Sequence, residues 1–163
     1  MSTKYSRLEV ERKWLVDALP PLAYHPRRIT DRYIVGTRLR LRRIDDPAGS
    51  NGIWKLGHKV RVDPASPFAI NHTSMYLDDA EAAVFTSLKA HRLVKIRWHV
   101  DIGDLTAAVD VFDPPHDGLI MIDVEVRTVE MATSFVAPAW FGREVTNNES
   151  FTGFALAQPP DHE

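Results

Sequence analysis

The chain contains no cysteine among its 163 residues. It therefore has no disulfide framework, no thiolate metal site and no cysteine nucleophile, which fits a reducing compartment such as the cytosol. No window approaches the ~18 uncharged apolar residues that a membrane helix needs. The first residues, Met1 to Arg7, lack the apolar run of a signal peptide. We therefore expect a cytoplasmic protein that has no membrane partner.

The chain also lacks an excess of charge of either sign. Twenty Lys and Arg residues nearly balance 22 Asp and Glu residues, so the formal net charge is -2. This balance argues against nucleic-acid binding driven by net charge. No internal repeat, low-complexity tract or long linker divides the sequence. We therefore expect one globular domain over residues 1–163, which is long enough to bury a core.

What is present is alternation with the two-residue period of β-strands. In several segments, apolar residues share one strand face and charged residues share the other. These segments are 8–16, 38–43, 53–62, 94–102, 109–112 and 120–127. Weaker segments at 29–35 and 71–77 supply the remaining strands, whereas 17–28 is too rich in proline to be assigned. The fold class is therefore α+β and mainly antiparallel β.

Helical signals are fewer. Asp78 followed by Glu81 is a capping-box pattern, and it precedes apolar residues whose helical spacing extends to His91. Thr146 and Glu149 repeat the capping pattern ahead of a short helix that ends near residue 158. We expect these few helices to pack outside the strands.

The charged strand faces sort acids and bases onto different strands. If the strands close into one barrel with these faces inward, the interior receives several acids and several bases. The acids are Glu9, Glu11, Asp110, Asp123 and Glu125, and the bases are Lys13, Arg40, Arg42, Lys55, Lys95 and Arg97. Burying an isolated charge costs several kcal/mol, so such an interior must be wet, internally paired or filled by a charged ligand. The alternative is that each face is an ordinary solvated sheet surface.

The sorting matches one kind of ligand. Carboxylates two residues apart on a strand project side by side and can share a hard cation such as Mg²⁺ or Mn²⁺. Guanidinium and ammonium groups on other strands can hold phosphate oxygens directly. A triphosphate satisfies both sets, whereas a mononucleotide or a sugar leaves several bases unpaired. The residues therefore favour a small-molecule triphosphate as the partner.

The motifs in chain order resemble one known family over nearly the whole sequence. The run from Glu9 to Lys13 is similar to the E-x-E-x-K signature of the CYTH family, also called triphosphate tunnel metalloenzymes. Further matches follow in the expected order. They are Leu39-Arg40-Leu41-Arg42, Trp54-Lys55-Leu56, Lys95-Ile96-Arg97-Trp98, Val109-Asp110-Val111-Phe112, Gly118-Leu119, Asp123-Val124-Glu125-Val126 and Trp140-Phe141-Gly142-Arg143-Glu144-Val145-Thr146.

This resemblance implies a closed eight-stranded β-barrel that hydrolyses inorganic or organic triphosphate with Mg²⁺ or Mn²⁺. One ion would orient the triphosphate and a second would activate water. The implied roles follow from matched positions. Glu9, Glu11, Lys13 and Glu125 would be catalytic; Lys13, Arg40, Arg42, Lys55, Lys95 and Arg97 would bind phosphate; Glu9, Glu11, Asp110, Asp123 and Glu125 would hold metal.

Three departures from the family pattern leave alternatives open. Asp123 replaces the usual glutamate, residues 68–75 carry no acid, and residues 149–157 lack a lysine. A triphosphate- or polyphosphate-binding module without turnover is therefore a second hypothesis. An adenylyl cyclase ranks below both, because no residue selects adenine. A homodimer also stays open. Of the histidines, His99 shares the face of Lys95, whereas His58 and His72 are expected to be structural or exposed.

Overall fold

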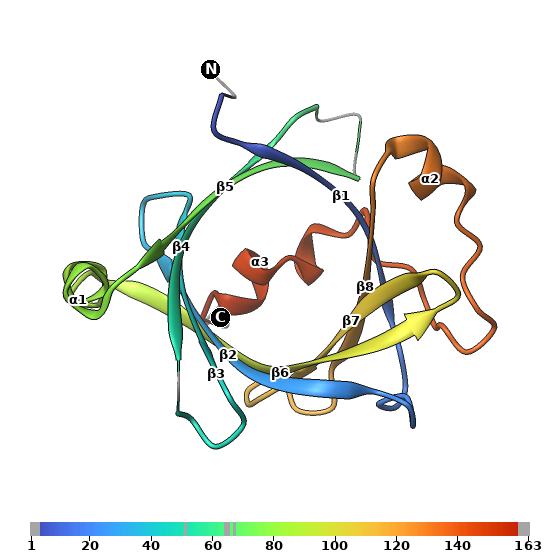
Figure 1. The fold of residues 1–163 in the computed structure, drawn as a ribbon, viewed down its shortest axis with the longest axis horizontal. Coiled ribbons are helices and arrows are strands. Elements are labelled where there is room, and N and C mark those ends of the chain that lie inside the picture. The colour runs from blue at the N-terminus through green and yellow to red at the C-terminus, as the bar shows by residue number, and fades with distance from the viewer. Residues whose placement is uncertain (1–3, 51, 64–65, 67, 160–163) are drawn as a thin grey trace.

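The computed structural model describes residues 4–50, 52–63, 66 and 68–159. Eight antiparallel strands close into one barrel in the order β1-β5-β4-β3-β2-β6-β7-β8 (Figure 1). The strands are β1 (Arg7–Leu15), β2 (Tyr24–Ile34), β3 (Leu39–Asp45), β4 (Ile53–Arg61), β5 (Ala69–Leu77), β6 (Ala90–Ile102), β7 (Leu105–Phe112) and β8 (Ile120–Val126). The predicted fold class is confirmed, and the unassigned proline-rich stretch contributes the start of β2.

The barrel consists of two antiparallel meanders and the strand β1, which closes the ring between them. Strands β2 to β5 pair in sequence order, and so do β6 to β8. β2 pairs with β6 at one junction, and β1 lies between β5 and β8 at the other. The E-x-E-x-K strand therefore has β8 on one side and β5 on the other, which determines the neighbours of its carboxylates.

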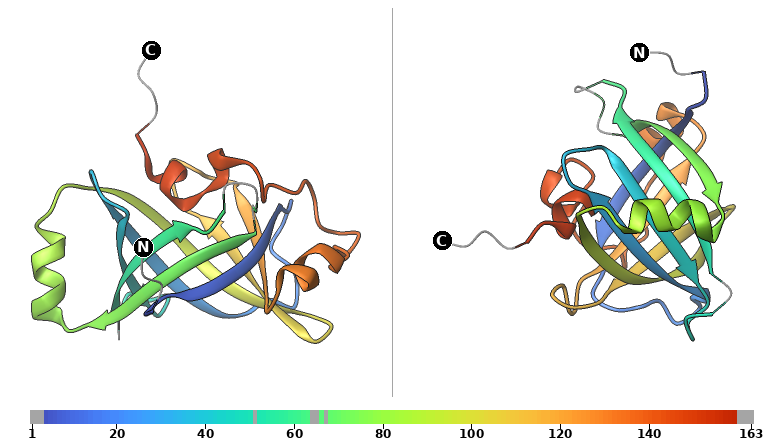
Figure 2. Two further views of the ribbon diagram at one scale, coloured as in Figure 1. Left: turned by 90° about the horizontal axis from the view of Figure 1, so that it is seen from above. Right: turned by 90° about the vertical axis from the view of Figure 1, so that its left-hand side faces the viewer.

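The first helix, α1 (Asp79–Thr86), lies outside the barrel between β5 and β6 (Figures 1 and 2). Its predicted capping box is confirmed, since Glu81 N donates to Asp78 Oδ1 at 2.8 Å and Asp78 N donates to Glu81 Oε2 at 2.9 Å. The predicted extension to His91 is wrong, because His91 already lies in β6 and pairs with Tyr33. No helix in the described ranges combines the length and the hydropathy needed to cross a membrane.

The C-terminal segment forms a short 3-10 helix, η1 (Glu149–Phe151), and then α3 (Gly153–Ala157). The helix is where the sequence predicts it, but Thr146 does not cap it. Instead, Asn148 caps η1 and Thr152 caps α3. Thr146 Oγ1 accepts a hydrogen bond from Lys13 N at 3.0 Å. The hydroxyl that resembles a helix cap therefore attaches the C-terminal segment to β1.

The apolar faces of the strands pack outside the barrel, as the alternation predicts. Val10, Val109, Ile122 and Val124 are almost completely buried there, together with Trp14. They pack beneath α2 (Val129–Ser134) and the following segment. The ring centroids of Phe135 and Phe141 lie 5.5 and 5.0 Å from the centroid of the Trp14 ring. The barrel interior is thereby left to the other face of each strand.

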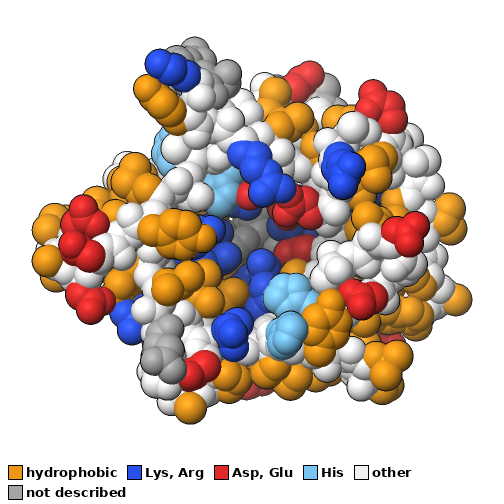
Figure 3. Space-filling model, viewed as in Figure 1, with side chains coloured by type: hydrophobic (Ala, Val, Ile, Leu, Met, Phe, Trp, Pro, Cys, Tyr) orange, Lys and Arg blue, Asp and Glu red, His pale blue; other side chains and the backbone are white. Residues whose placement is uncertain are grey.

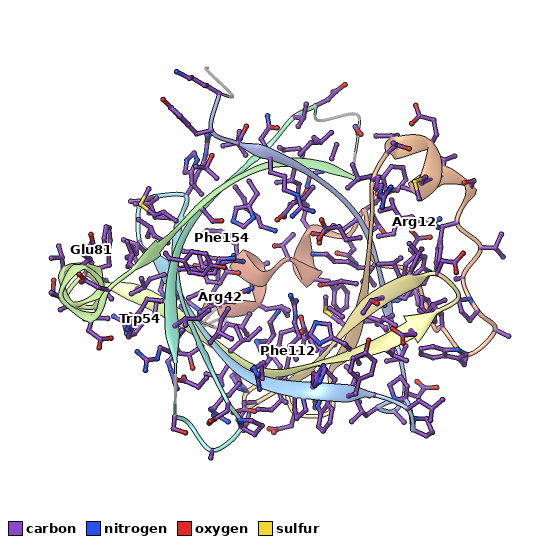
Figure 4. All side chains as sticks on the ribbon, in the orientation of Figure 1. Arg12, Arg42, Trp54, Glu81, Phe112 and Phe154 are labelled. Carbon is purple, nitrogen blue, oxygen red and sulfur yellow. The ribbon has the colours of Figure 1, made fainter. Side chains whose placement is uncertain are left out.

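Arg12 fastens the C-terminal segment to the outer face of β1. Its guanidinium donates to both Glu144 oxygens at 2.8 and 2.7 Å. It also donates to the carbonyls of Ala132 and Phe135 at 2.9 and 3.0 Å. Arg12 lies outside the ring of strands, on the side of α2, whereas Arg42 lies inside it (Figure 4). The two residues on either side of Arg12 in the signature therefore face the interior.

An apolar cluster occupies one end of the interior. Leu93, Phe112 and Met121 are buried there against Ala157 of α3. Leu15 and Tyr33 pack against the same cluster, among other residues. Figure 2 shows that α3 lies across one opening of the barrel. The expectation that apolar side chains remain outside is thus wrong at this end, because the C-terminal helix gives the inward-facing strand ends an apolar partner.

Candidate functional site

The interior contains a cavity of about 840 Å³. On the open face, a central hollow is rimmed by basic, acidic and histidine side chains (Figure 3). All predicted site residues except Asp110 line it. The lining members are Glu9, Glu11, Lys13, Arg40, Arg42, Lys55, Lys95, Arg97, Asp123 and Glu125. The structure therefore brings these predicted acids and bases together around one cavity that is open on one face.

One wall of the cavity, formed by β1 and β8, is acidic. Glu11 is opposite Glu125, and Lys13 is opposite Asp123. Lys13 Nζ lies 2.9 Å from Glu11 Oε1. Burial tends to raise the pKa of Glu11, but the Lys13 and Lys59 ammonium groups together lower it to about 2. Glu11 is therefore a carboxylate at neutral pH.

Asp123 is the least satisfied carboxylate of this wall. Burial, together with the nearby Glu11 and Asp110 carboxylates, raises the pKa of Asp123 against the opposing attraction of Lys13. Its Oδ2 receives only a long contact of 3.4 Å from Arg97 Nη2. Its Oδ1 is buried and has no hydrogen-bond partner in the described structure. An unpaired buried carboxylate oxygen is unfavourable unless a ligand satisfies it.

Glu9 lies where β1 meets β5 and is held by two residues that the sequence did not assign to the site. Lys59 Nζ lies 2.7 Å from Glu9 Oε2, and His72 Nδ1 lies 2.5 Å from Glu9 Oε1. Burial alone raises the pKa of Glu9, but these two contacts bring it well below its usual range. His72 was expected to be either structural or exposed. Its side chain is only 10% exposed, so the second of these placements is wrong. The sequence does contain an indication that Lys59 faces the site, because Lys59 shares a strand face with the predicted site residue Lys55.

Asp110 lies behind the basic side chains. It is 1% exposed and directly opposite Arg97 on the neighbouring strand β6. Arg97 donates to both of its oxygens at 2.7 Å, and Lys95 Nζ donates to Oδ2 at 2.5 Å. Burial opposes ionisation, but these cations hold the pKa of Asp110 well below its usual range. Asp110 thus contacts the two predicted phosphate-binding side chains of β6.

Asp31 forms a second such arrangement, which the sequence analysis did not anticipate. It is completely buried and lies opposite Arg42, which donates to its two oxygens at 2.6 and 2.7 Å. Burial alone raises the pKa of Asp31, but the Arg42 and Arg40 guanidiniums hold it well below its usual range. The sequence signal is an aspartate on a strand whose neighbouring strand carries arginines, but the pairing depends on an unknown register.

Arg40 and Lys55 are the predicted cations with the least compensation. Arg40 Nε lies 3.7 Å from Asp31 Oδ1, beyond hydrogen-bonding distance, and this buried nitrogen has no partner in the described ranges. Lys55 forms no ion pair within the described part of the chain. Burial, followed by the Arg42 and Arg40 charges, lowers the pKa of Lys55. Strands β3 and β4 therefore present positive charge that an anionic ligand can neutralise.

The acidic wall has the donor chemistry that Mg²⁺ or Mn²⁺ prefers. Asp123 Oδ1 is a buried oxygen without a hydrogen-bond partner among the described residues, and the Glu11 carboxylate pairs with Lys13. Among the described residues, however, no three potential ligands are already gathered around one point. Asp123, whose pKa burial raises, lies on the same wall as the Glu11 carboxylate, and a hard cation would satisfy both groups.

The chain matches no protein-family model. An inorganic triphosphatase from Nitrosomonas europaea is 24% identical over 159 residues, which cover 91% of this chain and 96% of that protein. A solved structure of the inorganic triphosphatase NE1496 is also 24% identical, covers 91% of this chain and 93% of that chain, and superposes with a TM-score of 0.62. HpAC1 from Hippeastrum, described as a candidate adenylyl cyclase with a dominant triphosphatase activity, covers 77% of this chain and 82% of that one at 13% identity and a TM-score of 0.51.

The closed antiparallel barrel with acidic and basic walls around one cavity is the architecture that the resemblance to triphosphate tunnel proteins implies. The ordered motifs and the full-length match to an inorganic triphosphatase agree with this architecture. The chain is therefore similar, in its ordered motifs and in its fold, to proteins of the CYTH, or triphosphate tunnel metalloenzyme, family.

Proposed function

We propose that this protein hydrolyses a triphosphate, with inorganic triphosphate as the first candidate, and releases phosphate within the barrel. The observation that carries the proposal is the cavity itself, in which the weakly compensated cations Arg40 and Lys55 of β3 and β4 and carboxylates of β1 and β8 line the same space. The match to an inorganic triphosphatase supports the same substrate class.

The phosphate chain would lie against the basic side of the cavity. Arg40 and Lys55 have charge available for its oxygens, and Arg42 and Arg97 present the guanidinium edges that their aspartates leave open. A charge-assisted contact of this kind contributes about 1.5–3 kcal/mol. Because Asp31 and Asp110 hold two of the arginines in place, little side-chain entropy remains to be lost when the substrate binds.

The reacting end of the substrate would face β1 and β8. Glu11, Asp123 and Glu125, with Glu9 beside them, would hold Mg²⁺ or Mn²⁺. When bound, the ion would neutralise phosphate charge and lower the pKa of an attacking water. Lys13 lies between Glu11 and Asp123 and can bind a phosphate oxygen near the same carboxylates. No covalent intermediate is required.

Phosphate release from tripolyphosphate, thiamine triphosphate and ATP, each with Mg²⁺ or Mn²⁺, tests this proposal. We expect metal-dependent release that chelation abolishes. Glu11→Gln should lose activity at least 100-fold, because it removes charge from the acidic wall, whereas the matched change Glu130→Gln on the exposed surface of α2 should not. The absence of release from all three substrates with both metals would rule out the triphosphatase.

The second candidate is a binding module with little turnover. It is favoured by the pairing of Glu9 with Lys59 and His72, which occupies both oxygens of a predicted metal ligand. Calorimetric titration of the same protein with tripolyphosphate separates the two candidates. Tight binding without phosphate release would support the module, and turnover that Glu11→Gln removes would exclude it.

A further inference from the structure

The inner faces of β3 and β4 change from charged to apolar along their length. Arg42 is followed two residues later by Ile44, and Lys55 is preceded two residues earlier by Ile53. Residues two apart on a strand share a face. Ile44 is directly opposite Ile53, just as Arg42 is directly opposite Lys55. The two isoleucines therefore continue the face that carries the phosphate-binding cations.

The position of α3 fixes the direction of this change. At the other end of the β3 row, Arg40 is directly opposite Tyr33, whose ring lies 6.0 Å from the ring of Phe154 in α3. Ile44 and Ile53 consequently lie towards the open face of the barrel, where they line a hollow of about 370 Å³. Figure 3 shows apolar side chains beside the central hollow on this face.

Tyr76 of β5 adds an aromatic ring to the same surface. It is directly opposite Lys55, so the two side chains leave the sheet on one face. Lys55 Nζ lies 5.3 Å from the centre of the Tyr76 ring. Tyr76 is nevertheless 70% exposed, so most of its ring stays available to a ligand. We call Ile44, Ile53 and Tyr76 together the mouth surface.

Strand β6 shows the same change of character. His99 follows Arg97 by two residues, and both side chains line the cavity. Burial, followed by the Arg97 charge, lowers the pKa of His99, so its ring is uncharged at neutral pH. A second wall of the cavity thus also presents an uncharged ring outward of a phosphate-binding cation.

Inorganic triphosphate has no apolar part and would leave the mouth surface exposed. Because Lys55 Nζ is 5.3 Å from the Tyr76 ring, a group attached to a phosphate that Lys55 holds would reach this ring directly. We propose that the mouth surface binds the planar aromatic head group of an organic triphosphate, stacked on Tyr76, while Lys55 and Arg42 hold the phosphate that carries it. This inference rests on the proposed function and extends its substrate class to triphosphates that carry a ring.

Calorimetric titration with tripolyphosphate, ATP and thiamine triphosphate in EDTA, without added metal, tests the contact. Tyr76→Ala should weaken binding of a ring-bearing triphosphate about 5- to 100-fold, the loss of one aromatic stacking contact, relative to tripolyphosphate. The readout is the ratio of the two dissociation constants, since an altered Lys55 would affect both ligands. A change for ATP alone would assign the surface to a nucleobase, and a change for thiamine triphosphate alone would assign it to the thiamine rings.

Two variants serve as matched controls. Tyr76→Phe keeps the ring and should bind all three ligands like wild type. Met75→Ala removes the adjacent side chain, which is 54% exposed but lies on the other face of β5, opposite Leu56. It should therefore leave the ratio unchanged. Thermal unfolding of each variant checks that it is folded.

The inference and the proposed function fail on different results. If Tyr76→Ala leaves the ratio unchanged for both ring-bearing ligands, or if wild type binds neither of them, the mouth surface has no such role. A ratio that changes with Phe154→Ala instead would place the head group at the end that α3 covers and would also overturn the inference. Binding and hydrolysis of tripolyphosphate would leave the proposed function intact in each case. If wild type binds no triphosphate, the proposed function fails as well.

Discussion

Replacing Asp31 by asparagine should destabilise the protein far more than an ordinary ion-pair deletion. Asp31 is completely buried and receives two hydrogen bonds of 2.6 and 2.7 Å from Arg42, whose side chain is itself only 12% exposed. Asparagine keeps the shape but removes the charge, so the Arg42 guanidinium stays buried without its counter-ion. Breaking a buried pair from one side costs about 3–5 kcal/mol, and we expect a loss of this size in the free energy of unfolding.

The matched control is Asp113→Asn. Asp113 accepts from Arg28 at a similar distance of 2.7 Å, but the two side chains are 31% and 36% exposed. Exposed pairs contribute about 0–1 kcal/mol, so this variant should be close to wild type. Urea unfolding of both variants at pH 7 measures the difference. The double variant Asp31→Asn/Arg42→Met should be more stable than Asp31→Asn alone, because it leaves no uncompensated charge.

The pH dependence has a defined sign. The pKa of Asp31 is lower in the folded protein than in the unfolded chain. Its contribution is therefore complete above the unfolded value of about 3.9 and is lost as pH falls through the folded value. The stability difference between wild type and Asp31→Asn should be constant near neutral pH and shrink below about pH 4. If Asp31→Asn lowered the free energy of unfolding as little as Asp113→Asn does, the buried Asp31–Arg42 pair would not have the stabilising role argued here.

Three further predictions follow from the same contacts. Arg40→Met should raise KM for tripolyphosphate at least about tenfold in steady-state kinetics and make binding less sensitive to salt, because it removes a cation that Asp31 only weakly compensates. An unchanged KM would contradict this. Burial, with the Arg97 and Arg42 charges, lowers the pKa of Lys95 to about 8 against the attraction of Asp110, so metal-free tripolyphosphate binding should weaken as pH rises from 7 to 9. Lys95→Arg should remove that decline, and a decline that persists would assign it to another group. Arg12→Met should lower the free energy of unfolding by about 2–3 kcal/mol in urea, whereas Arg61→Met, whose partner Glu149 is 75% exposed, should cost less than about 1 kcal/mol.

The strands and the faces of their side chains were predictable because the two-residue period depends only on local backbone geometry. Glu9, Glu11 and Lys13 face the cavity as the alternation requires. Local patterns failed where a tertiary partner competed. Thr146 bonds to β1 instead of capping a helix, and His91 pairs with β2 instead of extending α1.

The pairing among the site residues was not predictable, because it depends on register between strands. That Asp31 is opposite Arg42, and Asp110 opposite Arg97, follows from which residues align across two antiparallel pairs. The alternation only says that each side chain faces inward. His72 was missed for the same reason, since its contact with Glu9 requires β1 to lie beside β5, two strands that are far apart in the sequence.

The buried aspartates explain how a cavity with so many opposite charges can stay open. Lys59 and Lys13 already pair with Glu9 and Glu11, and longer arginine side chains that did the same would close the cavity. Both oxygens of Asp31 are instead bonded to Arg42, and both oxygens of Asp110 to Arg97, within adjacent strand pairs. These guanidiniums are thereby held against their own wall by contacts that an incoming anion does not need to break. A site prepared in this way spends less of its binding free energy on ordering side chains, which favours affinity for a densely charged ligand.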